Sequence, residues 1–317
     1  MELPLLHVLV RMLLLVFLFA SFGSAQLSTT AEWPKVGFNN QGTGQCPYLL
    51  GVASRPYVLW SYQTYYGGAI IGSPVMTSSG DIVFGAIDRA IYCISNAGTV
   101  KWAFDAEGYV TGSPTITADS VIIGSYSGKI YALNITTGTL QWNFTTGGVI
   151  GNSAAVTAAG DILMSSSDKS LYCLSRAGSL RWTFFTNSSA MSTPSISPDG
   201  SNIVVGSGTR LFSLSLAGEM LWNFSAKTTG IVNTQFAIAQ DGSISSVCGN
   251  TLYYLTSLGS VKWTYNVVGD ISTAPAIATS DGSIIFGTCS YFRASGGRNM
   301  DHHLYSISSA GSLNWRY

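Results

Sequence analysis

Residues 73–104 read SPVMTSSGDIVFGAIDRAIYCISNAGTVKWAF, and this stretch decides the fold. It contains four short segments in which apolar and polar residues alternate: SPVMTS, DIVFGA, AIYCIS and TVKWAF. The turn sequences SSGD, IDRA and NAG separate these segments. Alternation with a period of two is typical of strands, whereas a helix needs a period of 3.6 residues. The stretch therefore predicts four consecutive short strands.

The same unit recurs along the chain, and tryptophan is its clearest marker. Seven of the eight tryptophans are spaced by 42, 40, 40, 40, 41 and 52 residues: Trp60, Trp102, Trp142, Trp182, Trp222, Trp263 and Trp315. The last six of them have a glycine four residues earlier. Four strands in a repeat of this length are typical of one propeller blade. We predict an all-β fold, a β-propeller of about six four-stranded blades, which begin near residues 66, 106, 146, 186, 227 and 267.

The repeats differ in length at one place. From the second residue of a Ser-Pro-like step to the tryptophan there are 28 residues in five repeats and 40 in the sixth, which therefore carries a 12-residue insertion. Before the first repeat, YVLWSY at 57–62 looks like a lone fourth strand, with Pro56 in place of the glycine. Because the last repeat has its own fourth strand, the ring either has six blades or is a truncated seven- or eight-bladed ring.

The first 25 residues have the pattern of a secretory signal peptide. Arg11 precedes the apolar run 12–20, and the small residues Gly23 and Ala25 come before the expected cleavage position. The alternative is an uncleaved signal anchor, because the apolar residues extend just far enough to cross a bilayer. We expect a lead-in segment at 26–65 and the propeller at 66–317, with no membrane span after the signal segment.

Glycosylation motifs and composition agree with a secretory route. Four N-x-S/T sequons are present, at Asn134, Asn143, Asn187 and Asn223. Charged residues make up only 9% of the chain, with 15 basic and 15 acidic side chains. Such a balance argues against a disordered chain and against a nucleic-acid binder with a basic surface. We expect a glycoprotein that is secreted or lies in the lumen of the secretory pathway.

The repeat pattern S-P…L-Y-x-L-x(3)-G-x(3)-W resembles the repeats of pyrroloquinoline-quinone-type (quinoprotein-like) β-propellers. The resemblance covers about Trp33 to Tyr317, and the lead-in EWPKVGFNNQGTG is also similar to that of such domains. It implies that the outer-strand tryptophans dock against neighbouring blades and are structural: Trp102, Trp142, Trp182, Trp222, Trp263 and Trp315. A quinone-dependent dehydrogenase of this family would need a pocket on the axis and carboxylates for a metal, and it often has an adjacent cysteine pair.

Motifs for catalysis are missing from the sequence. It has no Cys-Cys step, no haem-attachment motif, no metal-spaced His/Cys/carboxylate cluster, no phosphate loop and no nucleophile elbow. Isolated acids such as Asp88, Asp168 and Asp270 are interpreted as turn formers or solvated charges. We therefore predict no catalytic residue, no cofactor and no metal, and no enzymatic activity.

The five cysteines also favour structural roles. Cys93 and Cys173 occupy the same position of the third strand, two blades apart, and are predicted to be small buried side chains. Cys248 and Cys289 fall at nearly equivalent places in adjacent blades, where a disulfide and two separate thiols both remain open. Cys46 has no obvious partner.

The insertion is the most distinctive candidate for a binding site. It is rich in aromatic and charged side chains in a chain that is otherwise poor in charge: Tyr291, Phe292, Arg293, Arg298, Asp301, His302 and His303. Loops of unequal length on a rigid scaffold are where binding usually resides, although a tolerated surface insertion is the alternative. Its Arg and His residues predict an acidic ligand, or tighter binding below about pH 6.5.

Two classes of function follow. The leading hypothesis is a non-catalytic scaffold that binds a protein or a glycan through its loop face. We use this term for the face that carries the loops between blades and those joining second to third strands, where the insertion is predicted to lie. The alternative is a quinone-dependent oxidoreductase or a fragment of one. A third reading resembles the propeller lipoprotein of bacterial outer-membrane assembly, but the lipid-anchoring cysteine is missing and the sequons argue against it.

Overall fold

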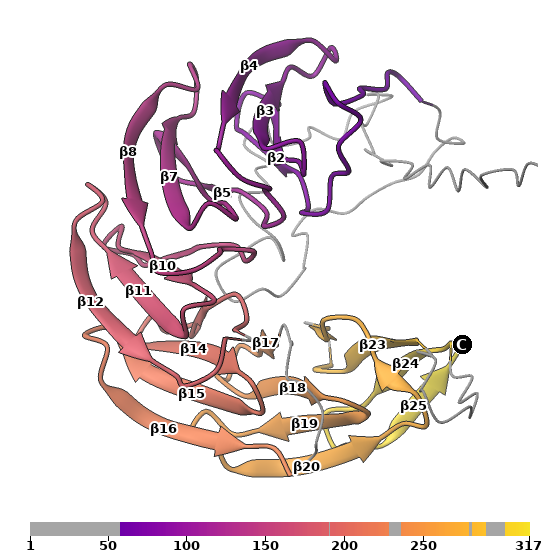
Figure 1. The fold of residues 1–317 in the computed structure, drawn as a ribbon. Coiled ribbons are helices and arrows are strands. Elements are labelled where there is room, and N and C mark those ends of the chain that lie inside the picture. Colours follow the sequence, from indigo (N-terminus) through magenta and orange to yellow (C-terminus); the bar gives the residue numbers. More distant parts are fainter. Residues whose placement is uncertain (1–57, 190, 228–235, 279–280, 290–301) are drawn as a thin grey trace, which may run out of the picture.

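The computed structural model describes residues 58–189, 191–227, 236–278, 281–289 and 302–317. Within these ranges the regular elements are strands, and none of them is a helix. Six antiparallel sheets follow one another along the chain. They form an open arc of blades in which the fourth strands lie at the rim (Figure 1). The predicted all-β propeller of six blades is confirmed.

The first three blades have four strands each, paired in sequence order. Blade 1 comprises β1 (Val75–Met76), β2 (Ile82–Gly85), β3 (Ala90–Ile94) and β4 (Val100–Asp105). Blade 2 comprises β5 (Thr115–Ile116), β6 (Ser120–Gly124), β7 (Lys129–Asn134) and β8 (Leu140–Thr145). Blade 3 comprises β9 (Ala155–Val156), β10 (Ile162–Ser165), β11 (Ser170–Leu174) and β12 (Leu180–Phe185).

The next blades follow the same order, with one exception. Blade 4 comprises β13 (Ser195–Ile196), β14 (Asn202–Ser207), β15 (Arg210–Ser215) and β16 (Met220–Ser225). Blade 5 comprises β17 (Ala237–Ile238), β18 (Ile244–Cys248), β19 (Thr251–Leu255) and β20 (Val261–Asn266). Blade 6 comprises β21 (Asp270–Ile271), β22 (Ala276–Ile277), β23 (Ile284–Cys289), β24 (Leu304–Ile307) and β25 (Leu313–Arg316).

Blade 6 has one strand more than the repeat pattern predicts. Both β21 and β22 pair with β23, β22 at its beginning and β21 at its end. In blade 1, β2 ends at a glycine, whereas β23 continues for two residues past the equivalent position, to Cys289. The segment at 270–271 pairs with this additional length of β23. Asp270 therefore lies in a strand, which corrects its interpretation as a turn former.

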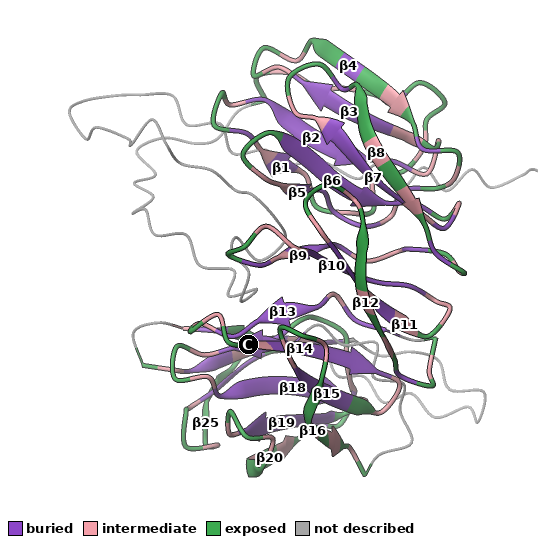
Figure 2. Cartoon of the chain, turned by 90° about the vertical axis from the view of Figure 1, so that its left-hand side faces the viewer, coloured by how far each residue is buried: buried purple, intermediate pink, exposed green. Residues whose placement is uncertain are grey.

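The core lies between the blades. Second and third strands are largely buried, whereas the residues of the rim strands are exposed or half-buried apart from Trp102 (Figure 2). The cluster between blades 1 and 2 shows the arrangement, with Val83 and Ile91 packed together with Val121, Ile123 and Leu133. Equivalent clusters join each blade to the next. Burial of apolar area between sheets, rather than within one sheet, therefore holds the arc together.

Three Asp-Gly turns connect first and second strands in blades 4, 5 and 6. Gly200, Gly242 and Gly282 of the three Asp-Gly turns all have positive φ, between 70° and 78°. Such values favour glycine, because a Cβ would approach the following carbonyl.

Residues 58–62, which were expected to form a lone fourth strand, are not in a strand. No strand of the described residues pairs with them, so the backbone ladder that defines a strand is missing there.

No described helix is long and apolar enough to span a bilayer. The predicted signal peptide, at 1–25, lies outside the described residues.

Candidate functional site

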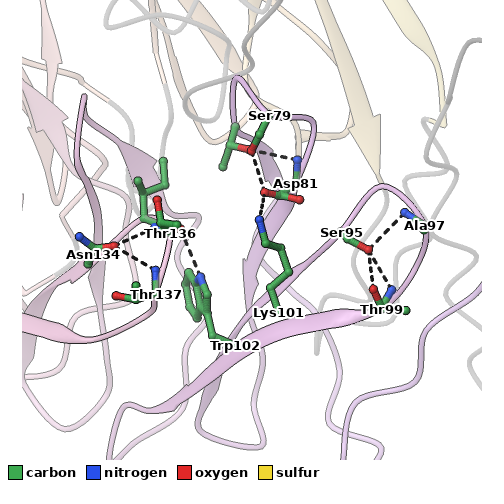
Figure 3. A network of polar contacts seen from close by, with 12 residues as sticks. Ser79, Asp81, Ser95, Ala97, Thr99, Lys101, Trp102, Asn134, Thr136 and Thr137 are labelled. Atoms are coloured by element: carbon green, nitrogen blue, oxygen red, sulfur yellow. Dashed lines mark hydrogen bonds and ion pairs between the residues drawn. The ribbon is translucent and has the colours of Figure 1, made fainter.

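The rim tryptophans make the most regular contacts of the molecule. Trp102, on β4 of blade 1, lies against Gly138 in the turn between the last two strands of blade 2. A Cβ built on Gly138 would lie 2.5 Å from the indole ring, so only glycine admits this approach. The indole Nε1 also donates a hydrogen bond to the carbonyl of Ile135, at 3.2 Å (Figure 3). One side chain thus joins two blades by packing and by a hydrogen bond.

Five further tryptophans make the same contact with the following glycine turn. The pairs are Trp60 with Gly98, Trp142 with Gly178, Trp182 with Gly218, Trp222 with Gly259, and Trp263 with Gly311. Their Nε1 atoms donate to turn carbonyls at 2.9–3.0 Å. The direction is constant, because each tryptophan contacts the blade that follows it.

At the two ends of the arc, the docked tryptophans differ from those that the sequence predicts. Trp60 docks although it was not included among the docking residues, and the equal spacing of the tryptophans is the signal that could have found it. Trp315 was expected to dock, yet it is 44% exposed, and no described blade follows it.

Hydroxyl groups form a second series of contacts near the first strands. The backbone N–H of Ser73 donates to Ser113 Oγ at 2.6 Å, and that of Ser113 donates to Ser153 Oγ at 3.1 Å. The N–H of Ser153 donates to Thr193 Oγ1 at 3.3 Å. The Ser-Pro-like steps of the sequence therefore link successive blades.

Two acids suggested as turn formers have defined partners. Tyr92 donates to Asp88 at 2.7 Å, and Tyr172 donates to Asp168 at 2.6 Å. A backbone N–H two residues after each acid donates to its second oxygen. Burial, together with the hydrogen bond to Asp168, raises the pKa of Tyr172 above its ordinary value. These acids hold turns and phenols in place.

The buried thiols are inert for a physical reason. Cys93 and Cys173 are both 1% exposed, and both are free. Burial raises the pKa of Cys93 to about 11 and that of Cys173 to about 12. A thiol that stays protonated is a poor nucleophile, so both positions act as apolar filling. Cys248 is buried on β18, whereas Cys46 and the side chain of Cys289 lie outside the described residues.

The candidate binding loop is described only at its end. It joins β23 to β24, as predicted, and Tyr291, Phe292, Arg293, Arg298 and Asp301 lie outside the described residues. His302 is exposed. The backbone of His303 exchanges hydrogen bonds with Thr288, and its ring lies edge-on to Tyr305 at 6.1 Å between centroids.

The sequons lie away from the inter-blade core. Asn143 and Asn223 are exposed on the rim strands β8 and β16, and Asn187 is exposed after β12 with a φ of 68°. Asn134 is half-buried at the end of β7, where its side-chain oxygen accepts the N–H groups of Thr136 and Thr137 (Figure 3).

Among the described residues, the first strands of the blades supply no group of carboxylates for the quinone site that the family resemblance implies. Strands β1, β5, β9, β13, β17 and β22 have the sequences VM, TI, AV, SI, AI and AI, and only β21 carries an acid, Asp270. In the part of the chain that the structure describes, no three His, Cys, Asp or Glu side chains gather as metal ligands would.

Comparisons with known proteins agree on the architecture. Residues 57–197 match the family model described as outer membrane protein assembly factor BamB. The crystal structure of BamB from Moraxella catarrhalis is similar at a TM-score of 0.58 and 14% identity, covering 78% of this chain and 88% of that one. No curated protein sequence matches the chain.

Two dehydrogenases share the fold as well. The quinohemoprotein alcohol dehydrogenase ADHIIG from Pseudomonas putida HK5 has a TM-score of 0.71 at 10% identity, covering 90% of this chain and 66% of that one. A europium-containing methanol dehydrogenase has a TM-score of 0.72 at 10% identity, covering 91% and 78%. The repeat and the matched family model support a β-propeller fold of the pyrroloquinoline-quinone-type repeat family.

Proposed function

We propose that this protein is a non-catalytic propeller scaffold that binds a protein or glycan partner through its loop face. The proposal rests on one observation, which is that the thiols and acids most capable of chemistry are buried or hydrogen-bonded in structural positions. The buried thiols fill inter-blade positions, and the acids Asp88 and Asp168 each accept a phenol and a backbone N–H. Side chains engaged in this way support the blades and are not available for general acid–base chemistry.

The binding surface of this proposal is the loop between β23 and β24. Tyrosine and arginine are favoured at interfaces, because each combines a large contact area with a polar end. The loop carries Arg293 and Arg298 with the pair His302 and His303, which supports an acidic partner. The exposed sequon residues on the rim support a secretory location, since glycans there leave the loop face open.

The matched experiment is a pull-down from secreted material. The wild-type chain is compared with a deletion of 291–302 and with the double variant Arg293→Ala/Arg298→Ala. The control is Arg89→Ala/Lys169→Ala, which removes two cations from the shorter turns at the same place in blades 1 and 3. We expect both loop variants to lose partners that the control keeps. Equal recovery by all four proteins would remove the loop from the proposal.

The second candidate is a quinone-dependent oxidoreductase, which the likeness to the two dehydrogenase folds favours. Incubation with pyrroloquinoline quinone and calcium, followed by dye-linked alcohol oxidation, separates the two candidates. The scaffold proposal expects no turnover above that of the heat-denatured chain. Saturable turnover would favour the oxidoreductase.

A further inference from the structure

A cavity of about 260 Å³ lies between blades 4 and 5. Its walls come from the turns that precede β14 and β18, from β15, and from the turn before β20. Asp199, Asn202 and Ser213 line it together with the apolar Val204 and Leu258. A polar group set beside an apolar wall is the usual composition of a small-molecule pocket.

One polar atom in this cavity lacks a partner. Ser213 is 1% exposed, and its Oγ is the one buried side-chain polar atom without a hydrogen bond among the described residues. Ser213 lies opposite the rim tryptophan of its own blade, Trp222. In blade 6 the equivalent residue, Ser306, accepts a hydrogen bond from Asn314 at 3.3 Å. A buried hydroxyl without a hydrogen bond destabilises the folded state, so a hydrogen-bond donor beside Ser213 would stabilise it.

The missing donor can be traced to one residue. The residue before the rim tryptophan is polar in five blades: Lys101, Gln141, Arg181, Lys262 and Asn314. Each of them bonds the side chain that precedes the second strand or lies at its start, as Lys101 bonds Asp81 at 2.6 Å (Figure 3). Blade 4 has Leu221 instead, half exposed. Among the described ion pairs, none supplies blade 4 with the ammonium or guanidinium found at this place in blades 1, 3 and 5.

The charge of the cavity fits the same reading. Lys262 lies 3.5 Å from Asp241, whereas Asp199 takes part in no ion pair within the described residues. Hydrogen bonds from Ser197 and Ser201 lower the pKa of Asp199 to about 2, so its carboxylate is charged at neutral pH. The walls carry two carboxylates, Asp199 and Asp241, and the nearby ammonium of Lys262 offsets only the second.

We propose that this cavity binds a primary alkylammonium group, with the charge beside Asp199, Asn202 and Ser213 and the alkyl chain along Val204 and Leu258. The ligand supplies the positive charge that a lysine or arginine side chain supplies at the position of Leu221 in blades 1, 3 and 5. Lys262 shows the chemistry within this chain, because its Nζ donates to Ser243 Oγ at 2.6 Å while it lies near Asp241. A free amine and a lysine side chain of a partner peptide offer the same group.

The test titrates the full chain with n-pentylamine and, as a neutral isostere, n-pentanol, followed by calorimetry or by amide chemical shifts. We expect saturable binding of the amine and at least about tenfold weaker binding of the alcohol, since a charge-assisted bond is lost. Asp199→Asn should weaken amine binding by about tenfold or more. The control Asp281→Asn, at the equivalent turn of blade 6, should leave it unchanged.

Leu221→Lys is the decisive variant, because it restores the cation from within. We expect it to abolish amine binding and to raise the melting temperature. Circular dichroism confirms its fold, and Asp199→Asn, on a surface turn, carries the test if the lysine variant does not fold. Equal binding of amine and alcohol, unchanged binding in Asp199→Asn, or no saturable binding would each overturn the proposal and leave a cavity that holds water only.

A second arm identifies the source of the ammonium group. A short peptide with one central lysine is compared with the same peptide carrying norleucine. Binding of the lysine peptide at least about tenfold tighter than that of pentylamine assigns the site to a partner protein's lysine. Binding no tighter than pentylamine assigns it to a free amine.

Discussion

The two ends of the arc contain the same residue type in different surroundings. At the first end, Trp60 lies on Gly98 and donates to the carbonyl of Asn96 at 2.9 Å. Tyr62 lies edge-on to Tyr92 beside it, at 5.7 Å between ring centroids. At the last end, Trp315 is 44% exposed. The first end is covered by a segment that is not a strand, whereas the last end is a complete strand that no described segment covers.

This difference separates strand formation from docking. β25 pairs with β24 through Ser306 and Trp315, in the register that Ser213 and Trp222 adopt in blade 4. Local pairing therefore forms the strand whether or not its tryptophan is docked. Burial of the indole depends on the glycine turn of the following blade. Docking is a property of two blades, and each blade stabilises the one before it.

The largest expected effect compares the best buried tryptophan with the exposed one. Trp102→Ala removes an indole that is 8% exposed, and we expect a loss of about 3–5 kcal/mol in the free energy of unfolding. Trp315→Ala should cost less than about 1 kcal/mol, because little buried area is lost. Urea unfolding of both variants measures the difference. Equal losses would show that the last end is covered in solution.

The next effect tests the glycine side of the contact. Gly138→Ala combines a positive φ of 70° with a Cβ only 2.5 Å from the Trp102 ring, so we expect a loss of about 2–4 kcal/mol. Gly200→Ala has a similar φ of 73° but meets no atom within 4 Å. It should cost about 1–2 kcal/mol from the backbone alone. The difference in thermal stability between the two variants measures the cost of the contact between the added Cβ and the Trp102 ring. Equal losses would show that this contact costs nothing.

A smaller effect is expected at the first end. Trp60→Ala uncovers Gly98 and the cluster of Phe84 and Tyr92, and should cost about 1–3 kcal/mol because the indole is only half-buried. Amide hydrogen exchange should speed up in β2 and β3 and stay unchanged in blades 3 to 5. Uniform acceleration along the chain would contradict a contact confined to this end.

The smallest effect concerns an ion pair between blades 2 and 3. Arg176 lies 2.9 Å from Asp119 and lowers the pKa of that carboxyl. Because the pKa of this carboxyl is lower in the folded state, its ionised form stabilises the fold fully at any pH above the ordinary carboxyl pKa. This stabilisation is lost as the pH falls through the folded-state pKa. Because both side chains are more than half exposed, Arg176→Met should cost less than about 1 kcal/mol at pH 7. The urea midpoints of variant and wild type should converge as the pH falls below the lowered pKa of Asp119. A gap that does not narrow on acidification would exclude the ion pair as its cause.

The sequence predicted the blades well for a physical reason. Strand alternation, turn glycines and the tryptophan spacing are local or periodic, and the structure follows them to within a residue or two. Three features were missed because they depend on partners in space. Asp270 joins a strand only because β23 is long, Trp60 docks without a strand, and Ser213 lacks a donor because Leu221 breaks a pattern visible only across blades. The candidate loop stays a prediction, since residues 290–301 lie outside the described ranges.

The constant direction of the contacts has a consequence for how such a chain can change. Each of the six docked tryptophans meets a glycine of the next blade, and each of the first three Ser-Pro-like steps donates to the hydroxyl of the next. Excision of the 40 residues from 107 to 146 would bring Trp102 to Gly178 and Ser73 to Ser153, with no new type of interface. Duplication of one unit would do the reverse. Whole repeats are thus interchangeable units of recombination. Insertions of other lengths keep the contacts only where they fall in a loop, as the 12-residue insertion of blade 6 does, because Trp263 still docks on Gly311 beyond it.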